Sequence, residues 1–181
     1  TRQSSHATAS RPSLEATEPP GVLGFRMPAE WEPHRATWLT WPHAWHDWET
    51  KLPAIHWCYV EIVRQLVSGE RVALLFKDAA HETRARRKLE QASVDLSRVE
   101  SYTIRTNRSW MRDYGPVFVI RSNGEEATSD QRREIAITDW RFNSWARYSN
   151  WKLDNEVPAR VADLLGVGVH DGNEVVHGLE K

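Results

Sequence analysis

The amino-acid sequence predicts a domain of the α/β or α+β class. Short apolar runs alternate with segments in which apolar residues recur three and four positions apart, and Gly, Pro and Asn residues separate them. Read in order, these segments give β-α-β-α-β-β-β-α. The chain has 181 residues, of which 40% are hydrophobic, which suits one globular domain. Periodicity alone does not choose between the two classes.

The first predicted elements are a strand and an amphipathic helix. Residues 35–41 form an apolar run that ends at Pro42, as expected for a buried strand. Residues 43–50 are predicted to be a loop. Residues 52–67 then carry apolar side chains at helical spacing, and Gly69 is the expected end of that helix.

The next segments repeat this alternation. Residues 71–76 are a short apolar strand, and residues 79–92 read as a charged helix on the surface. Residues 99–104 alternate weakly and predict a third strand.

The second half predicts two strands and a helix. Residues 117–120 form an apolar strand, turned by residues 122–124 toward a strand at 134–140. Asp154 can cap a helix that continues to Leu165, with Gly166 at its end.

Composition excludes several classes of protein. A formal net charge of −1 gives no general attraction to nucleic acid, and no run approaches the roughly 18 apolar residues of a membrane span. The one cysteine, Cys58, excludes an internal disulfide framework and a multi-cysteine metal site, and suits a reducing, cytoplasmic location. We expect residues 1–24 to be a disordered leader and residues 25–181 to be the domain.

The chain holds ten tryptophans, six of them between Trp31 and Trp57. Core packing is the expected role of most of them. The alternative is a cleft wall for a cation or a sugar, because indole faces attract both.

Residues 110–116, Trp-Met-Arg-Asp-Tyr-Gly-Pro, place a carboxylate beside an aromatic ring on a tight turn between two apolar runs. This combination predicts a site for a flat cation, with Asp113 and Trp110 as its binding residues. The alternatives are that Asp113 is a turn or salt-bridge aspartate, partnered by Arg112, and that Trp110 packs in the core. Arg112 is expected to be structural, since its charge would repel a cation.

This motif, with Thr106 and Asn107 before it, resembles the guanidinium signature of the agmatine deiminase family, relatives of the bacterial peptidylarginine deiminases. Further blocks that resemble the family occur in the same order over residues 25–181: Met-Pro-Ala-Glu-Trp-Glu-Pro-His at 27–34, Trp-Leu-Thr-Trp-Pro-His at 38–43, Lys-Leu at 51–52, Glu-Ile-Val at 61–63, Asp-Trp-Arg-Phe-Asn-Ser-Trp at 139–145, and residues 153–166.

The resemblance implies a five-bladed α/β propeller of ββαβ-like modules, of which this chain holds about two. It implies hydrolysis of an alkylguanidine, with agmatine expected and free arginine or peptidyl arginine left open, without metal or organic cofactor. It assigns Asp113 to hold and stabilise the guanidinium and Trp110 to cover it. Leu179-Glu180 resembles a family block in which the glutamate orients the catalytic histidine. The histidine, its aspartate and the nucleophilic cysteine are then expected beyond Lys181.

Two departures from the family pattern stand out. Arg108 replaces a common acidic residue and is expected to alter the charge at the tunnel mouth, and Lys181 replaces a glycine. His43 and His46 are expected in a loop rather than on a metal, and Cys58 as a buried helix thiol that is no nucleophile. The alternative function is a non-catalytic cation-binding module. The expected partner is a small guanidine, with no nucleic acid and no membrane, and homo-oligomerisation is left open.

Overall fold

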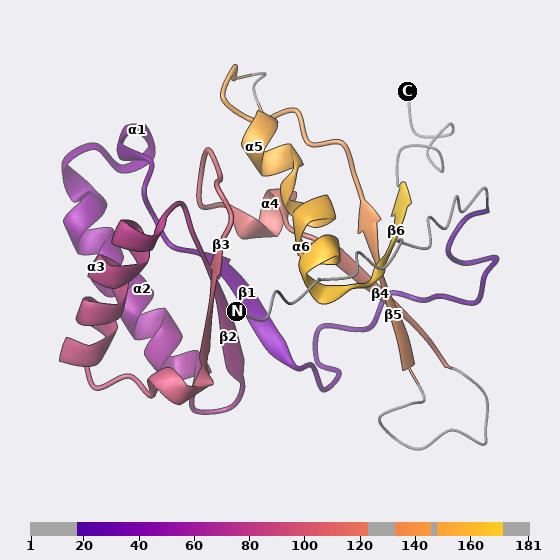
Figure 1. Ribbon diagram of the computed structural model, residues 1–181, viewed down its shortest axis with the longest axis horizontal. Coiled ribbons are helices and arrows are strands. Elements are labelled where there is room, and N and C mark those ends of the chain that lie inside the picture. Colours follow the sequence, from indigo (N-terminus) through magenta and orange to yellow (C-terminus); the bar gives the residue numbers. More distant parts are fainter. Residues whose placement is uncertain (1–17, 123–132, 146–147, 172–181) are drawn as a thin grey trace, which may run out of the picture.

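The computed structural model describes residues 18–122, 133–145 and 148–171. It confirms a mixed α/β fold with two three-stranded sheets. The sheets stand apart with helices between them, and two further helices cover the outer face of the first sheet (Figure 1). The number of propeller blades and the leader at residues 1–24 stay predictions. Within the described part of the chain, no helix is long and apolar enough to cross a membrane.

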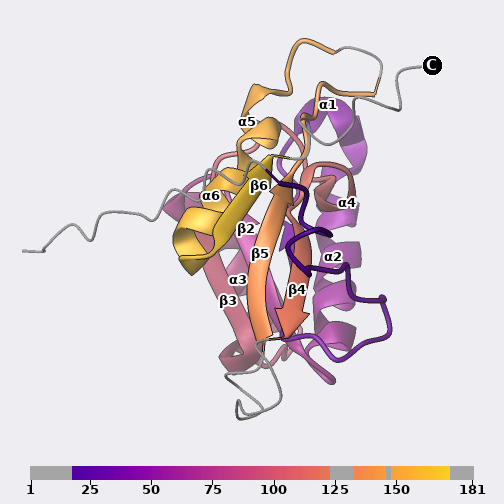
Figure 2. The same ribbon diagram turned by 90° about the vertical axis from the view of Figure 1, so that its right-hand side faces the viewer.

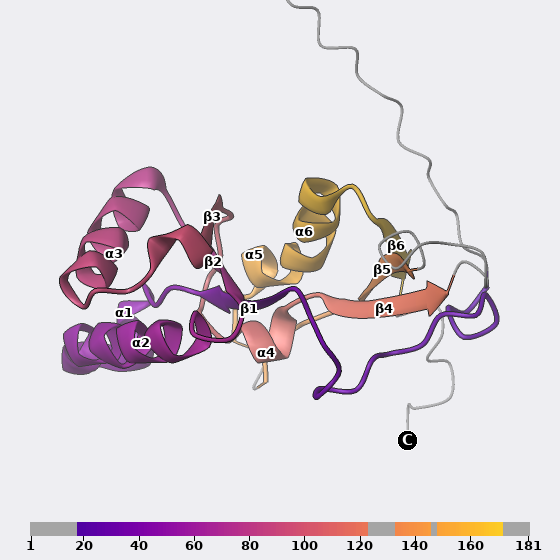
Figure 3. The same ribbon diagram turned by 90° about the horizontal axis from the view of Figure 1, so that it is seen from below.

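The first sheet is parallel throughout and has the order β1-β2-β3. Its strands are β1 (Ala36–Thr40), β2 (Arg71–Phe76) and β3 (Val99–Thr103). Helices α2 (Leu52–Leu66) and α3 (Ala79–Gln91) lie on one face of it (Figure 3). Parallel neighbours need such crossover helices, so the predicted β-α-β-α-β order produces this unit directly. A short helix, η2 (Leu96–Arg98), precedes β3.

The core follows from the alternation of side chains along β2. Val72, Leu74 and Phe76 pack against α2 and α3, whereas Leu75 belongs to the cluster on the opposite face. All four side chains are fully buried. Both faces of this strand are therefore covered, which explains why its sequence is a continuous apolar run.

The second sheet joins β4 (Val117–Ser122), β5 (Arg133–Asp139) and β6 (Gly168–Asp171). The β4–β5 pair is antiparallel and the β5–β6 pair is parallel (Figure 2). Helix α6 (Val157–Leu165) lies between the two sheets, and its Val157 and Val161 share a cluster with Leu75 and Ile137. In the N-terminal segment, Phe25 packs against Val119 and Ala136 of this sheet, and Arg26 pairs with Ile120 of the edge strand β4 through an antiparallel bridge.

Several local predictions are wrong. The predicted loop at 43–50 contains helix α1 (Trp45–Trp48) and the start of the short helix η1 (Glu49–Lys51). The tight turn of the 110–116 motif holds helix α4 (Met111–Tyr114), and strand β6 was not predicted. Residues 123 and 124 of the predicted hairpin turn lie outside the described residues.

Two predictions about burial are wrong as well. Cys58 is exposed, because it lies two positions from the buried Val60 and so faces away from the sheet. Core packing does not account for most tryptophans, since only Trp41 is fully buried. Six of the ten are exposed: Trp31, Trp45, Trp57, Trp110, Trp140 and Trp145.

Candidate functional site

The 110–116 motif lies where the polypeptide passes from the first sheet to the second. The carboxyl ends of parallel strands meet at one edge of a sheet, so the segment after β1 and the segment after β3 become neighbours. The rings of Trp48, in α1, and Trp110 lie 5.1 Å apart between their centroids. The third ring comes from the segment after β5, where Trp145 stands edge-on to Trp110 with centroids 6.4 Å apart. Three distant segments thus build one aromatic surface.

Asp113 is placed beside these rings by α4. Its Oδ1 accepts a 2.9 Å hydrogen bond from the indole Nε1 of Trp145. The alternative pairing with Arg112 is wrong, because Arg112 donates to Glu30 instead. Asp113 is exposed and, among the described residues, has no ion-pair partner. Trp110 is 38% exposed and belongs to no core cluster, so its core-packing alternative is wrong too.

Arg108 forms a largely buried ion pair with Asp47 of α1. Its side chain is 14% exposed and that of Asp47 5%. The guanidinium also lies 5.0 Å from the ring centroid of Tyr148 and 5.9 Å from that of Trp145, and it donates to Asn150. The positive charge expected at the tunnel mouth is therefore paired with a carboxylate and covered by rings.

The loop before α4 is held by Asp154, in the one-turn helix α5 (Lys152–Asn155). Its Oδ1 accepts hydrogen bonds from the backbone N–H groups of Asn107 and Arg108, at 2.6 and 3.2 Å. Asn107 returns a bond through its Oδ1, which accepts from the Leu153 N–H at 2.9 Å. Desolvation raises the pKa of Asp154 to about 6 against the lowering effect of these N–H bonds. The predicted role of Asp154 as a helix cap is wrong, since α6 has no side-chain cap.

Tyr114 also holds the loop before α4, through hydrogen bonds of its hydroxyl group. Its hydroxyl donates to the carbonyl oxygen of Arg108 at 2.8 Å and lies 2.9 Å from the Thr40 hydroxyl. The side chain is 2% exposed, and desolvation raises its pKa well above the ordinary value. Tyr114 is therefore a neutral structural hydroxyl that ties the loop to β1.

A cluster of histidines fixes the segment after β1. His56 and His81 both donate from Nε2 to the carbonyl oxygen of Pro42, at 2.9 and 3.3 Å, while His43 lies 2.8 Å from the Thr106 hydroxyl. Desolvation lowers the pKa of His43 and of His81 to about 4, so both rings are neutral at pH 7. His46 stands apart, exposed on α1. Among residues 18–122, 133–145 and 148–171, no three His, Cys, Asp or Glu side chains form a group that could hold a metal ion.

Of the predicted site residues, the structure brings Trp110 and Asp113 together, and Glu180 lies outside the described residues. Sequence reasoning missed Trp48, Trp145, Asp47 and Asp154. Two of these had a usable signal, because Trp145 and Asp154 both fall in blocks that resemble the agmatine deiminase family.

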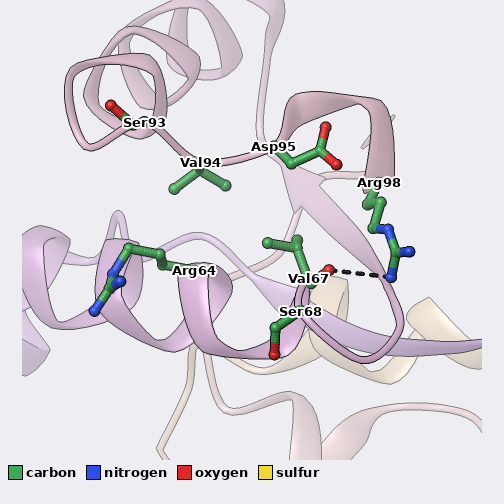
Figure 4. A pocket seen from close by; sticks show the side chains of 7 residues that line it. All are labelled: Arg64, Val67, Ser68, Ser93, Val94, Asp95 and Arg98. Carbon is green, nitrogen blue, oxygen red and sulfur yellow. Dashed lines mark hydrogen bonds between the residues drawn. The ribbon is translucent and has the colours of Figure 1, made fainter.

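A shallow surface pocket lies elsewhere, at the C-terminal end of α2 and beside η2 (Figure 4). Two arginines line it, but Arg64 bonds Glu61 and Arg98 donates to the carbonyl oxygen of Val67. Figure 1 places this end of α2 away from α1 and α4. The pocket is therefore separate from the aromatic surface around Asp113.

Comparison with known proteins places these features in a group. Residues 26–178 match the family of Porphyromonas-type peptidyl-arginine deiminases. The agmatine deiminase of Medicago truncatula is 33% identical over 164 residues, which cover 88% of this chain and 42% of that protein. The agmatine deiminase of Ectopseudomonas mendocina (strain ymp) is 31% identical over 155 residues, or 83% of this chain and 38% of the relative.

Solved structures give the same relationship. The agmatine deiminase of Enterococcus faecalis superposes with a TM-score of 0.71 at 25% identity, over 84% of this chain and 39% of that one. A C. jejuni agmatine deiminase superposes with a TM-score of 0.62 at 22% identity, over 81% and 39%. The chain thus spans about two fifths of the length of the relatives it matches.

Proposed function

The chain belongs to the family of Porphyromonas-type peptidyl-arginine deiminases, and on this premise we propose that it supplies the guanidinium-recognition part of a hydrolase that deiminates an alkylguanidine. Agmatine is the proposed substrate, and N-carbamoylputrescine and ammonia are the products. The relatives are hydrolytic deiminases that act on guanidino groups. The observation that carries the proposal is the Asp113 carboxylate, exposed and held by Trp145 beside the ring of Trp110.

This arrangement suits a guanidinium for two reasons. A planar cation with a fork of N–H donors is matched by a carboxylate, which accepts two of them in one plane. Indole faces add cation–π attraction where water is excluded. The neighbouring cations do not oppose this, because Arg108 and Arg112 are paired with Asp47 and Glu30.

The chemistry requires more groups than these. In the proposed reaction a thiolate attacks the guanidinium carbon, ammonia leaves with a proton from a general acid, and water then attacks the thiouronium to give the urea product and free thiol. Asp113 holds two guanidinium nitrogens and stabilises the cation before attack. We assign Glu180, from the resemblance, to orienting the histidine. Cys58, exposed on α2, is not assigned to the nucleophile.

Asp113→Asn is the direct test. We expect this variant to weaken agmatine binding to the chain at least tenfold, about 1.4 kcal/mol, because charge-assisted hydrogen bonds to the cation are lost. Glu90→Gln is the matched control, since it removes one exposed carboxylate from α3, on the outer face of the first sheet. In a polypeptide of the relatives' full length that carries this chain, Asp113→Asn should abolish turnover. Near-normal kcat/KM there would exclude the role given to Asp113.

The second candidate is a module that binds a cation without catalysis. The feature that favours it is that this chain alone supplies both the carboxylate and the three rings. It requires the 181-residue chain itself to bind agmatine, and a titration with neither heat nor chemical shift change would remove it. Titrating a peptide with an internal arginine in parallel separates agmatine from peptidyl arginine as the preferred ligand.

A further inference from the structure

Asp154 is completely buried, and its carboxylate accepts a hydrogen bond from a loop that is 47 residues away in sequence. The two segments exchange hydrogen bonds in both directions. Asp154 Oδ1 accepts from the N–H groups of Asn107 and Arg108, and the Asn107 side chain accepts from the N–H of Leu153. We call this reciprocal pair of contacts the lock. It joins the first turn of α5, where the Leu153 N–H has no partner within the helix, to the loop before α4.

The loop between β3 and α4 depends on partners of this kind. Residues 104–110 have no helix or strand of their own, yet Thr106 and Ser109 are 5% and 3% exposed. Backbone N–H groups in such a buried loop must find acceptors outside regular structure. Asp154 supplies the acceptor for two successive N–H groups immediately before Ser109 and Trp110. It therefore fixes the backbone from which the recognition residues project.

Burying the charged carboxylate of Asp154 costs folding free energy. Asp154 Oδ2 is buried and has no hydrogen-bond partner among the described residues. Two charged side chains act on the carboxylate, since Arg108 attracts it and Asp47 repels it, and the neutral hydroxyl of Tyr114 lies nearby. Burial outweighs the attraction and raises the pKa of Asp154 to about 6. A costly buried charge that holds a ligand-binding loop is typical of a functional device rather than of fold stabilisation.

We propose that Asp154 is a positioning residue, which locks residues 107–108 so that Trp110 and Asp113 are held ready for a guanidinium. Its relevance to catalysis rests on the proposed function, but the lock can be tested without any ligand. Three variants of the 181-residue chain suffice. Asp154→Ala removes the acceptor, and Asp154→Asn keeps an acceptor oxygen without the charge. Val161→Ala is the control, because Val161 is fully buried in α6.

Hydrogen exchange measured by NMR reports directly on the hydrogen bonds that Asp154 accepts from the Asn107 and Arg108 amides. In Asp154→Ala we expect the protection factors of the Asn107 and Arg108 amides to fall at least about tenfold more than those of β2. In Val161→Ala the protection falls without selecting these two amides. Equal protection of both amides in Asp154→Ala and the wild type overturns the proposal, as does the same selective loss in Val161→Ala.

The pH profile keeps the test decisive if Asp154→Ala does not fold. The locked state, with a pKa of about 6 for Asp154, binds the proton more tightly than a state that exposes this carboxylate, so the wild type should gain protection of these two amides, relative to β2, as the pH falls from 7 toward 5. Asp154→Asn is neutral at every pH and should show protection no more than about threefold below that of the wild type at pH 7, with no such gain. A gain of the same size in both proteins overturns the role of the charge.

Agmatine titration separates the two proposals. If the wild type binds agmatine, Asp154→Ala should bind it at least about tenfold more weakly and Asp154→Asn should recover most of the affinity at pH 7. Unchanged affinity in an Asp154→Ala protein whose loop exchanges freely overturns positioning. If the wild type binds no agmatine while the exchange results hold, the lock stands and the proposed function of the isolated chain fails.

Discussion

The indole Nε1 of Trp145 donates a 2.9 Å hydrogen bond to Oδ1 of Asp113, across 32 residues of sequence. This bond fixes the rotamer of an exposed carboxylate, which would otherwise sample several orientations in water. It also leaves Oδ2 and the remaining lone pair of Oδ1 to accept from a ligand. Asp113 is therefore preorganised by a residue that stands outside its own motif.

Trp145→Phe tests this preorganisation. The substitution keeps an aromatic ring but removes the donor, so we expect agmatine affinity to fall about three- to tenfold, which corresponds to one hydrogen bond of roughly 0.5–1.5 kcal/mol. The matched control is Trp140→Phe, because Trp140 is also exposed and its Nε1 donates to Thr138 rather than to Asp113. Calorimetric titration of both variants checks the prediction, and equal affinities would contradict it.

Asp154→Asn should change the pH dependence of stability. The folded pKa of Asp154, about 6, lies above its unfolded value of 3.8, so the folded state binds the proton more tightly. The cost of the buried charge is absent below pH 3.8, grows as the pH rises, and is complete above pH 6. Relative to the wild type, Asp154→Asn should gain up to roughly 3 kcal/mol of unfolding free energy between pH 4 and pH 7.

Urea unfolding at both pH values measures this gain. Asp95→Asn is the control, because hydrogen bonds from Ser97 lower the pKa of Asp95 in the folded state. Its unfolding free energy relative to the wild type should stay nearly constant between pH 4 and pH 7, since the effect of a lowered pKa appears at more acid pH. A constant difference between Asp154→Asn and the wild type would show that Asp154 carries no buried charge.

His81→Gln should make the fold more tolerant of acid. The pKa of His81 falls from 6.5 to about 4 on folding, first through desolvation and then through repulsion by His43, Lys77 and Arg84. The neutral ring is favoured in the fold, so stability is lost as the pH falls below 6.5 and the unfolded chain takes up the proton. At pH 5 the wild type should lose roughly 2 kcal/mol through this group, and His81→Gln should not.

Glutamine is the suitable replacement because its amide nitrogen can take the place of Nε2 near the Pro42 carbonyl. His46→Gln, on the exposed surface of α1, is the control. Thermal or urea unfolding at pH 7 and pH 5 gives the difference. The prediction is contradicted if the two variants respond identically to the change in pH.

Gly115→Ala should destabilise the end of α4. A Cβ at this position would lie 2.4 Å from the carbonyl oxygen of Met111 and 2.7 Å from its sulfur. That carbonyl accepts the Gly115 N–H at 2.8 Å, so the turn cannot open without losing the bond. We expect a loss of about 1–3 kcal/mol. Gly69→Ala, where a Cβ meets nothing within 4 Å, should be neutral or slightly stabilising.

The regular elements with strong apolar periods were predictable, and the short ones were not. Strand β2 and helix α2 lie within a residue of their predicted bounds, because their apolar side chains are buried against each other. Helices α1 and α4 have four residues each, too few for any periodic signal. Strand β6, Gly-Val-His-Asp, has no apolar run and is defined by its pairing with β5.

In the candidate site, too, contacts between segments that are distant in sequence were not predicted. Trp110 and Asp113 were found because they are three residues apart in one motif. The partners that hold them, Trp145 and Asp154, come from segments more than 30 residues away. Cys58 was misplaced for a related reason, since helical periodicity did not show that Val60 and Val63 define the buried face.

The buried pair of Arg108 and Asp47 makes these two positions interdependent in evolution. An acidic residue at position 108 opposite Asp47 would bury two like charges. The loss of Asp47 would leave the guanidinium of Arg108, which is 14% exposed, without the carboxylate that it pairs with. Neither change is tolerated alone, so descendants of this sequence should substitute both positions together or neither. An alignment of such sequences should therefore show covariation between α1 and the recognition loop, across 61 residues of chain.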